Sequence, residues 1–442
     1  MSEKIITLQP VVGSATEMIQ AAVDECFACG GGTVVLENGV YHVGSVRVRS
    51  NVTVYLKKNV LILGSRNIAD YDILRKDKIE PLLPEDITYT MWSSPRRDRD
   101  CSFLKKAGSY WTIAIFRVVR AKNVKIIGEP GCVIDGQNSY NPNGEGKCRG
   151  AHGISMYNSS DMEFDGLTIR NTGNWAFASY FCQNMTFRNL RIFGGYDGVH
   201  TSAADNVLVE NCEMDVGDDC IAGFDINGMT VRNCSLDTHC STFRVGGTNI
   251  LIENCTTKAY GKFVHPYRRS LEDKIAGVTT ENYGELRHPL SFFTYYSDFS
   301  LDVRNRPGNV VVRNCQFDST SRMFHFNFSG NEMWQSNRPL EDITFENVTA
   351  TNIGMSLSAY GDKEYPFTLT IKDSTITFAE PQPEFIQAAY TTLVDLENVK
   401  IEGVDGPLMR SWGGECEFRL KNVEGITENV VEADQPFNRR AI

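Results

Sequence analysis

The sequence lacks any run of 18 apolar residues and has no excess of positive charge. Its 44 Lys and Arg stand against 55 Asp and Glu, which leaves a formal net charge of −11. Such a chain has no general field that attracts nucleic acid or an anionic membrane. The first residues, MSEKIITLQPVVGS, have neither the basic start nor the apolar stretch of an export signal. We therefore expect no nucleic-acid partner, no membrane partner and a cytoplasmic location.

Cysteine pairs suited to metal binding or redox chemistry are also scarce. The chain has 13 cysteines, and Cys26 and Cys29 have the C-x-x-C spacing. A zinc site needs a second pair or nearby histidines, and this segment has neither. Reduced thiols in a cytoplasm are the simplest interpretation. We predict no metal site and no cofactor.

Internal repetition is the strongest feature of the sequence. A short β-branched segment that ends in Asn and a small apolar residue recurs at Asn189, Asn211, Asn233 and Asn254, and again at Asn314, Asn347, Asn398 and Asn422. The first four copies are spaced by 22, 22 and 21 residues. This period is typical of one coil of a parallel β-helix, whose coils stack about 4.8 Å apart.

The alternation within each repeat predicts which residues enter the core. Val207 and Val209 face one way, and the aligned positions in later repeats are also apolar. The Asn column is expected at a bend, where a side-chain amide satisfies the turn backbone. The cysteines that follow it are expected to form a small buried stack: Cys212, Cys234, Cys255 and Cys315.

The expected fold class is therefore all-β, a single-stranded parallel β-helix that spans residues 1–442 as one domain. Residues 14–29 are predicted to form a short N-terminal capping helix, with a capping box from Ser14 to Glu17. Residues 70–110 and 256–307 are predicted to be loop insertions, because they interrupt the repeat. Long loops on a rigid stack commonly carry the walls of a substrate site.

Two acidic segments lie one predicted coil apart. Asp197 precedes the pair Asp218 and Asp219 by 21 residues, His239 follows one coil later, and Arg244 comes five residues after His239. Mutual repulsion among carboxylates at the same phase favours a protonated acid beside an ionised base. Such a set suits metal-free cleavage of a glycosidic bond. Calcium held by the three carboxylates is the alternative, as are simple turn roles for Asp197 and His239.

With these residues the chain resembles glycoside hydrolase family 28, the polygalacturonase family of right-handed parallel β-helices in the pectin lyase-like superfamily. The similarity is carried by residues 19–24, 30–34, 133–137 and 174–175 and, most specifically, by Gly217-Asp218-Asp219-Cys220-Ile221-Ala222. The resemblance implies that Asp218 is the general acid and that Asp197 and Asp219 activate water. We place His239 among the catalytic residues and assign Trp175 and His200 to substrate binding.

Three departures from the family pattern concern substrate recognition. The family's Asn-Thr-Asp reads Gly195-Tyr196-Asp197 here, and its Gly-His-Gly reads Thr238-His239-Cys240. Its Arg-x-Lys clamp for a substrate carboxylate has no clear counterpart. The candidates to replace that clamp are Arg244, Arg268 and Arg269.

The expected activity is that of a glycosidase with an oligosaccharide or polysaccharide substrate. We expect inverting, exo-acting hydrolysis of pectin-derived or related oligosaccharides, since long insertions would close one end of a cleft. Inversion calls for about 6.5–9.5 Å between the acid and base carboxyl groups. Two alternatives stay open: a β-helix polysaccharide lyase, which would need calcium and a base at C5, and a non-catalytic carbohydrate-binding solenoid.

Overall fold

The computed structural model describes residues 4–74, 110–143, 148–257, 261–265, 270–276, 289–295, 307–328, 339–390, 392–434 and 437. Residue contacts divide the chain into two compact units. Unit 1 consists of Met1–Asp218 with Lys262–Glu285, and unit 2 of Asp219–Gly261 with Leu286–Ile442. The prediction of a single domain over residues 1–442 stays a prediction.

Unit 1 is built mainly from short strands in parallel pairs. Its helical segments are α1 (Thr16–Ala28), η1 (Ile68–Asp70), η4 (Tyr110–Thr112) and α6 (Leu271–Ala276). Its strands are β1 (Lys4–Leu8), β2 (Gly32–Leu36), β3 (Gly39–Val43), β4 (Val46–Val48), β5 (Val52–Leu56), β6 (Val60–Gly64), β7 (Ala114–Val119), β8 (Lys122–Gly128), β9 (Val133–Asp135), β10 (His152–Tyr157), β11 (Ser160–Asp165), β12 (Thr168–Arg170), β13 (Phe177–Arg188), β14 (Arg191–Gly194), β15 (Val199–Glu210) and β16 (Glu213–Val216).

Unit 2 continues the same pattern of parallel strands. Its strands are β17 (Ile221–Arg232), β18 (Ser235–Thr238), β19 (Ser241–Glu253), β20 (Thr256–Thr257), β21 (Ser291–Tyr295), β22 (Gly308–Arg313), β23 (Gln316–Asp318), β24 (Phe324–Asn327), β25 (Asp342–Glu346), β26 (Thr349–Ile353), β27 (Leu357–Tyr360), β28 (Phe367–Gln382), β29 (Ile386–Ala389), β30 (Thr392–Val404), β31 (Pro407–Trp412), β32 (Cys416–Glu424) and β33 (Thr427–Glu432). None of the described helices combines the length and apolarity that a membrane span requires.

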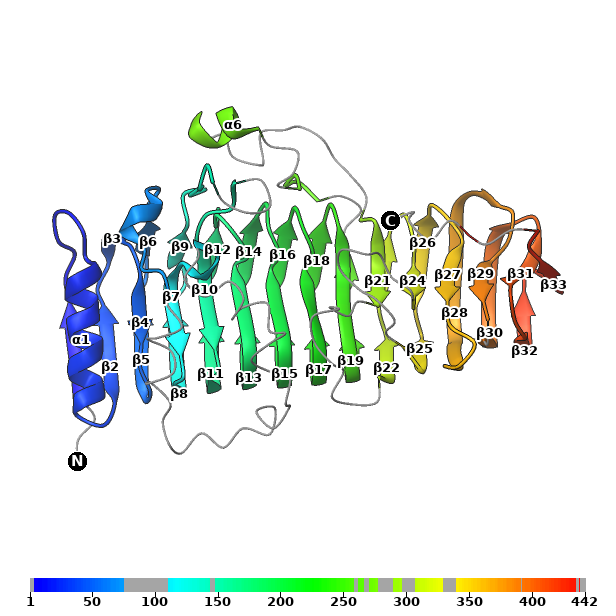
Figure 1. Ribbon diagram of the computed structural model, residues 1–442, viewed down its shortest axis with the longest axis horizontal. Helices are drawn as coiled ribbons and strands as arrows, with labels where there is room; N and C mark the ends of the chain where they lie inside the picture. The colour runs from blue at the N-terminus through cyan, green and yellow to red at the C-terminus, as the bar shows by residue number, and fades with distance from the viewer. Residues whose placement is uncertain are drawn as a thin grey trace. The chain divides into compact units, whose positions relative to one another are not determined.

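Each strand pairs with the equivalent strand one coil further along, as the repeat predicts. In unit 1, β13 pairs with β15 in a register that sets Phe177 opposite Val199, a step of one 22-residue period. In unit 2, β17 pairs with β19 in the same parallel sense (Figure 1). The chain is thus a parallel β-helix, which confirms the predicted fold class.

The Asn columns mark the bends of the coils. Asn189, Asn211, Asn233 and Asn254 all have φ between 54° and 56°, a left-handed conformation that Asn tolerates better than most residues. In unit 2 the Asn254 amide donates to Asn233 Oδ1 at 3.2 Å, so neighbouring coils are bonded through this column. A second column, not used in the sequence analysis, links Asn206 to Asn184 and Asn249 to Asn227.

The predicted core phase is confirmed. Val207 and Val209 are buried, and so are the aligned pairs at 229 and 231 and at 250 and 252. The four predicted stack cysteines are buried as well, and each thiol points to the carbonyl two residues before it, as Cys234 does to Arg232 at 3.2 Å. These thiols therefore act as small core side chains.

The N-terminal helix is confirmed, but its predicted capping box is wrong. Helix α1 begins at Thr16, and its N-cap residue Ala15 makes no side-chain cap bond. The Ser14 hydroxyl accepts instead from the Thr16 N–H at 3.3 Å, because the chain enters the helix one residue later than a capping box requires. Ile19 and Val23 of this helix are buried, and α1 lies beside β2 (Figure 1).

The two predicted insertions differ in how much structure they hold. Most of residues 70–110 lies outside the described residues. The interval 256–307 is not a plain loop, because it contains α6 and two ladder strands, β20 and β21. Strand β21 pairs with β19 and β24, so the coil continues through this segment after a long excursion.

Candidate active site

Asp197 lies between β14 and β15 in unit 1 and is held by an aromatic stack. His200 Nδ1 donates to Asp197 Oδ2 at 2.7 Å, and the His200 ring lies flat on Trp175, with ring centroids 3.7 Å apart. All three side chains are buried, and Asp197 is only 4% exposed. The predicted substrate residues Trp175 and His200 therefore meet the predicted catalytic residue Asp197. In this arrangement they fix its orientation.

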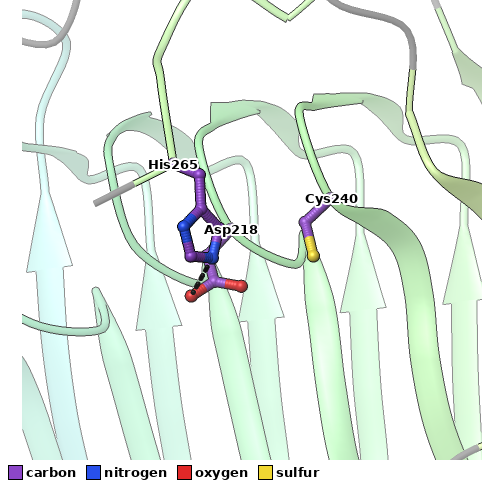
Figure 2. Close-up of side chains that lie close together, drawn as sticks. All are labelled: Asp218, Cys240 and His265. Carbon is purple, nitrogen blue, oxygen red and sulfur yellow. Dashed lines mark ion pairs between the residues drawn. The ribbon is translucent and has the colours of Figure 1, made fainter. Parts of the chain in front are cut away.

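Asp218 follows β16 and contacts two side chains of the same unit, Arg149 and His265. Its Oδ2 lies 3.6 Å from an Arg149 guanidinium nitrogen and 3.4 Å from His265 Nε2. Figure 2 shows the His265 imidazole facing the Asp218 carboxylate. Asp218 is only 7% exposed, so these contacts act in a largely water-free setting where charge interactions are strong.

Arg149 is in turn fixed by its own surroundings. It donates to Asn174 Oδ1 at 2.8 Å, and its guanidinium lies 4.8 Å from the Tyr196 ring centroid and 5.5 Å from that of Trp111. A guanidinium over aromatic faces is held by cation–π attraction. It therefore presents a positive charge to Asp218 in a defined geometry.

The backbone beside His265 approaches the acidic motif closely because residue 217 is a glycine. A Cβ at Gly217 would lie 2.3 Å from the Val264 carbonyl oxygen and 2.7 Å from that of Gly195. Any other residue would push the Val264-His265 segment away. The glycine of the Gly217-Asp218 motif thus has a steric role in placing His265.

The carboxylates of Asp197 and Asp218 converge. One oxygen of each lies within 4.8 Å of the other, because β14 and β16 are neighbouring rungs of one parallel pair. This limit concerns one oxygen of each residue, so the expected separation of about 6.5–9.5 Å between the two carboxyl groups stays a prediction.

Asp219 has its partners in unit 2. Its Oδ1 accepts the Ser241 N–H at 3.0 Å, and its Oδ2 lies 3.4 Å from Arg244 NH1. Both partners come from β19, and Asp219 is fully enclosed. Arg244, predicted to bind substrate, thus contacts a carboxylate that is predicted to be catalytic. The consecutive residues Asp218 and Asp219 contact different side chains.

The remaining predicted site residues are His239, Arg268 and Arg269. His239 is buried and its Nε2 donates to the Gly261 carbonyl at 2.8 Å within unit 2, and its catalytic role stays a prediction. Arg268 and Arg269 lie outside the described residues. The sequence analysis did not find Arg149, which has no motif around it. It did not single out His265 either, although a long insertion rich in Tyr, Arg and His was a usable indication.

A divalent cation would compete with charges already present at Asp218. Asp197 and Asp218 each have a carboxylate oxygen that could ligate an ion. The Asp218 carboxylate, however, already contacts Arg149 and His265. Repulsion between a guanidinium and a metal ion at this distance disfavours calcium. The arrangement of these side chains therefore favours general acid–base catalysis over metal binding.

Comparisons with known proteins agree with the coil architecture. A family described as "Right handed beta helix region" matches residues 119–269. A probable polygalacturonase from Vitis vinifera is 27% identical over 219 residues, which are 47% of this chain. The matched segment spans 40% of that relative.

Solved structures with a similar fold cover most of the chain. An exopolygalacturonase from Thermotoga maritima has a TM-score of 0.64 and 14% identity, and covers 91% of this chain and 93% of its own. A family 28 exopolygalacturonase from Yersinia enterocolitica has a TM-score of 0.64 and 15% identity, with 97% and 79% covered. At such identities the likeness concerns the fold. The chain is therefore a right-handed parallel β-helix whose distant homologues include polygalacturonases.

Proposed function

We propose that the chain is a glycoside hydrolase that cleaves pectin-derived or related oligosaccharides from one end, with inversion. The observation that carries the proposal is the buried pair Asp197 and Asp218, whose nearest oxygens lie within 4.8 Å. Two carboxylates this close favour sharing a single proton. A proton donor then stands beside an ionised carboxylate, and glycosidic cleavage needs both groups.

Each residue of the site has a defined task in this mechanism. Asp218 protonates the leaving oxygen, and Arg149 and His265 hold its carboxyl group in place. Asp197, oriented by its bond to His200, takes the proton of the attacking water. In unit 2, Asp219 is oriented by Ser241 and Arg244, and the family resemblance implies the same task for it. Positioning and general acid–base catalysis then supply the rate without a metal.

The similar proteins support the substrate class. The Vitis vinifera relative is named a probable polygalacturonase, and the two structural neighbours are exopolygalacturonases. A polygalacturonide carries one carboxylate per sugar, and guanidinium groups bind carboxylates well. The arginines Arg149 and Arg244 near the acids agree with an acidic substrate.

The close Asp197–Asp218 pair makes stereochemistry the decisive test. Two hydrogen bonds of about 2.8 Å each can bridge two oxygens that lie up to 4.8 Å apart, so a water molecule shared by both carboxylates is part of the proposal. Hydrolysis of galacturonide oligomers, followed by proton NMR of the first-formed anomer, should show inversion. Retention would refute the assignment of Asp197 as a water-activating base and make it a nucleophile.

Variants separate acid from base. Asp218→Asn should lose several orders of magnitude in kcat on oligogalacturonides and much less on activated aryl glycosides, whose leaving group needs little protonation. Asp197→Asn should be slow on both. Asp161→Asn is the matched control, because Asp161 belongs to the same unit and, within the described part of the chain, bonds to Asn184 and Ser160 at a bend away from Asp218.

Two other results would replace the proposal. An unsaturated, ultraviolet-absorbing product and loss of activity in EDTA would identify a lyase. Tight oligosaccharide binding without turnover, unchanged in Asp218→Asn, would identify a binding protein.

A further inference from the structure

Arg322 is a buried cation that no carboxylate neutralises in the part of the chain that the structure describes. It lies just before β24 in unit 2 and is 8% exposed. Arg410 of the same unit is paired with Glu384 at 3.1 Å, but Arg322 has no ion pair of this kind. A buried guanidinium normally needs such a partner, because its desolvation is costly.

The hydrogen-bond partners of Arg322 are uncharged side chains, which stabilise a buried positive charge less than a carboxylate does. One terminal nitrogen donates to the Ser358 hydroxyl at 2.6 Å and lies 3.5 Å from His325 Nδ1, and the other donates to the Met355 thioether at 2.9 Å. The Tyr360 side chain is a further hydrogen-bond partner of the guanidinium. Nε is buried and has no hydrogen-bond partner. A thioether is a poor acceptor. None of these partners is a carboxylate, so among the described residues the positive charge of the guanidinium is not balanced.

His325 beside it adds no negative charge. Its Nδ1 lies 2.6 Å from the Ser358 hydroxyl and 3.5 Å from a terminal nitrogen of Arg322. A guanidinium only donates, so Nδ1 accepts. The imidazole is then neutral, with its N–H at Nε2. Burial and the neighbouring Arg322 charge lower the pKa of His325 to about 3, which agrees with a neutral ring. We call Arg322, His325, Met355 and Ser358 the Arg322 cluster.

The cluster belongs to the same strand row as the Asp219 site. Arg244 is in register with Thr294, Thr294 with His325, and His325 with Ser358. These positions alternate with core residues such as Phe293 and Phe324, so they share the face opposite the core. Two rungs separate Arg244 from His325, which is about 10 Å along unit 2. That span is comparable to the length of a disaccharide.

We propose that the Arg322 cluster is a second anion subsite, which binds the carboxylate of an acidic sugar in an oligosaccharide that also reaches Asp219 and Arg244. The inference rests on the proposed glycosidase function and names its substrate class as an oligouronide of several acidic residues. Arg322 supplies a positive charge that the carboxylate of an acidic sugar would balance. The Nε2–H of His325 supplies a further donor from the same row.

The test measures binding without turnover. In an Asp218→Asn background, trigalacturonate and its methyl ester, which lacks the charge, are titrated by calorimetry. Adding Arg322→Gln should weaken trigalacturonate binding about 10- to 100-fold, the loss of a charge-assisted contact, and leave the methyl ester unaffected. Arg313→Gln is the matched control, because Arg313 is paired with Glu253 on a different strand row of the same unit. It should change neither titration.

Equal trigalacturonate affinity with and without Arg322→Gln would overturn the inference. Equal competition by sodium sulfate and by galacturonate monomer would also overturn it, since the cluster would then be a general anion site with no reach along a chain. Should Arg322→Gln fail to fold, Ser358→Ala provides the milder change and should show a smaller loss with the same preference for the charged ligand.

The subsite and the proposed activity can fail separately. A wild-type protein that hydrolyses oligogalacturonides, together with an Arg322→Gln variant of unchanged affinity, removes the subsite alone. Arg322-dependent binding of trigalacturonate by a protein that hydrolyses no galacturonide removes the activity and leaves the subsite in place.

Discussion

Replacing Gly217 by Ala tests whether close backbone packing places the His265 imidazole on Asp218. The added Cβ would lie 2.3 Å from the Val264 carbonyl oxygen and 2.6 Å from its carbon. Ordinary contacts begin near 3.4 Å, so the backbone next to His265 has to withdraw by about 1 Å. Because backbone atoms stand on both sides, no side-chain rotation relieves the clash.

The expected cost has a structural and a functional part. Overpacking of this kind destabilises by about 1–3 kcal/mol, which a denaturant titration measures as a lower free energy of unfolding. Withdrawal of His265 from its 3.4 Å contact with Asp218 should lower kcat on galacturonide oligomers on the order of 100-fold, the effect of a 1 Å misplacement in a catalytic site.

Gly194→Ala is the matched control from the neighbouring coil of the same unit. Its Cβ would meet nothing closer than the Asn171 backbone nitrogen at 3.5 Å, an ordinary contact. This variant should stay within about 0.5 kcal/mol of the wild type and keep its kcat. Two variants with indistinguishable stability and rate would refute the steric role of Gly217.

Three further predictions concern the fold, the substrate and pH. Val231→Asp buries an unpaired carboxylate at a fully enclosed position and should cost several kcal/mol, whereas Arg232→Asp on the outer face should cost much less; equal melting temperatures would contradict the strand phase. Arg244→Lys keeps the charge but loses the planar guanidinium, so KM on uronic acid substrates should rise with little change in melting temperature. An unchanged KM would mean that Arg244 has a structural role and does not bind the substrate. Because the pKa of His325 is lowered to about 3 by burial and by a neighbouring arginine, the unfolded chain binds one more proton between pH 6.5 and 3. Stability is full above pH 6.5 and falls by about 1.4 kcal/mol per pH unit below it; His325→Gln should remove this slope, and an equal slope in both proteins would contradict the assignment.

The repeated parts of the structure could be predicted from the sequence. The spacing of Asn189 and Asn211 fixes the coil length, and the bends fall at those residues. Val231 is buried as the alternation requires. Such features are local and recur in every coil, so each repeat supports the same register. The convergence of Asp197 and Asp218 follows from the same regularity, because a one-coil step returns the chain to the same side.

The surroundings of the acids were decided by tertiary structure alone. Arg149 and His265 reach Asp218 from segments that do not repeat, and His265 does so because Gly217 lets a distant backbone approach. Among the described residues, Arg322 has no acidic partner because its neighbouring rungs present other side chains. Periodicity specifies how coils stack. It carries no information about where an irregular segment closes over them, since that depends on the packing of particular atoms far apart in the chain.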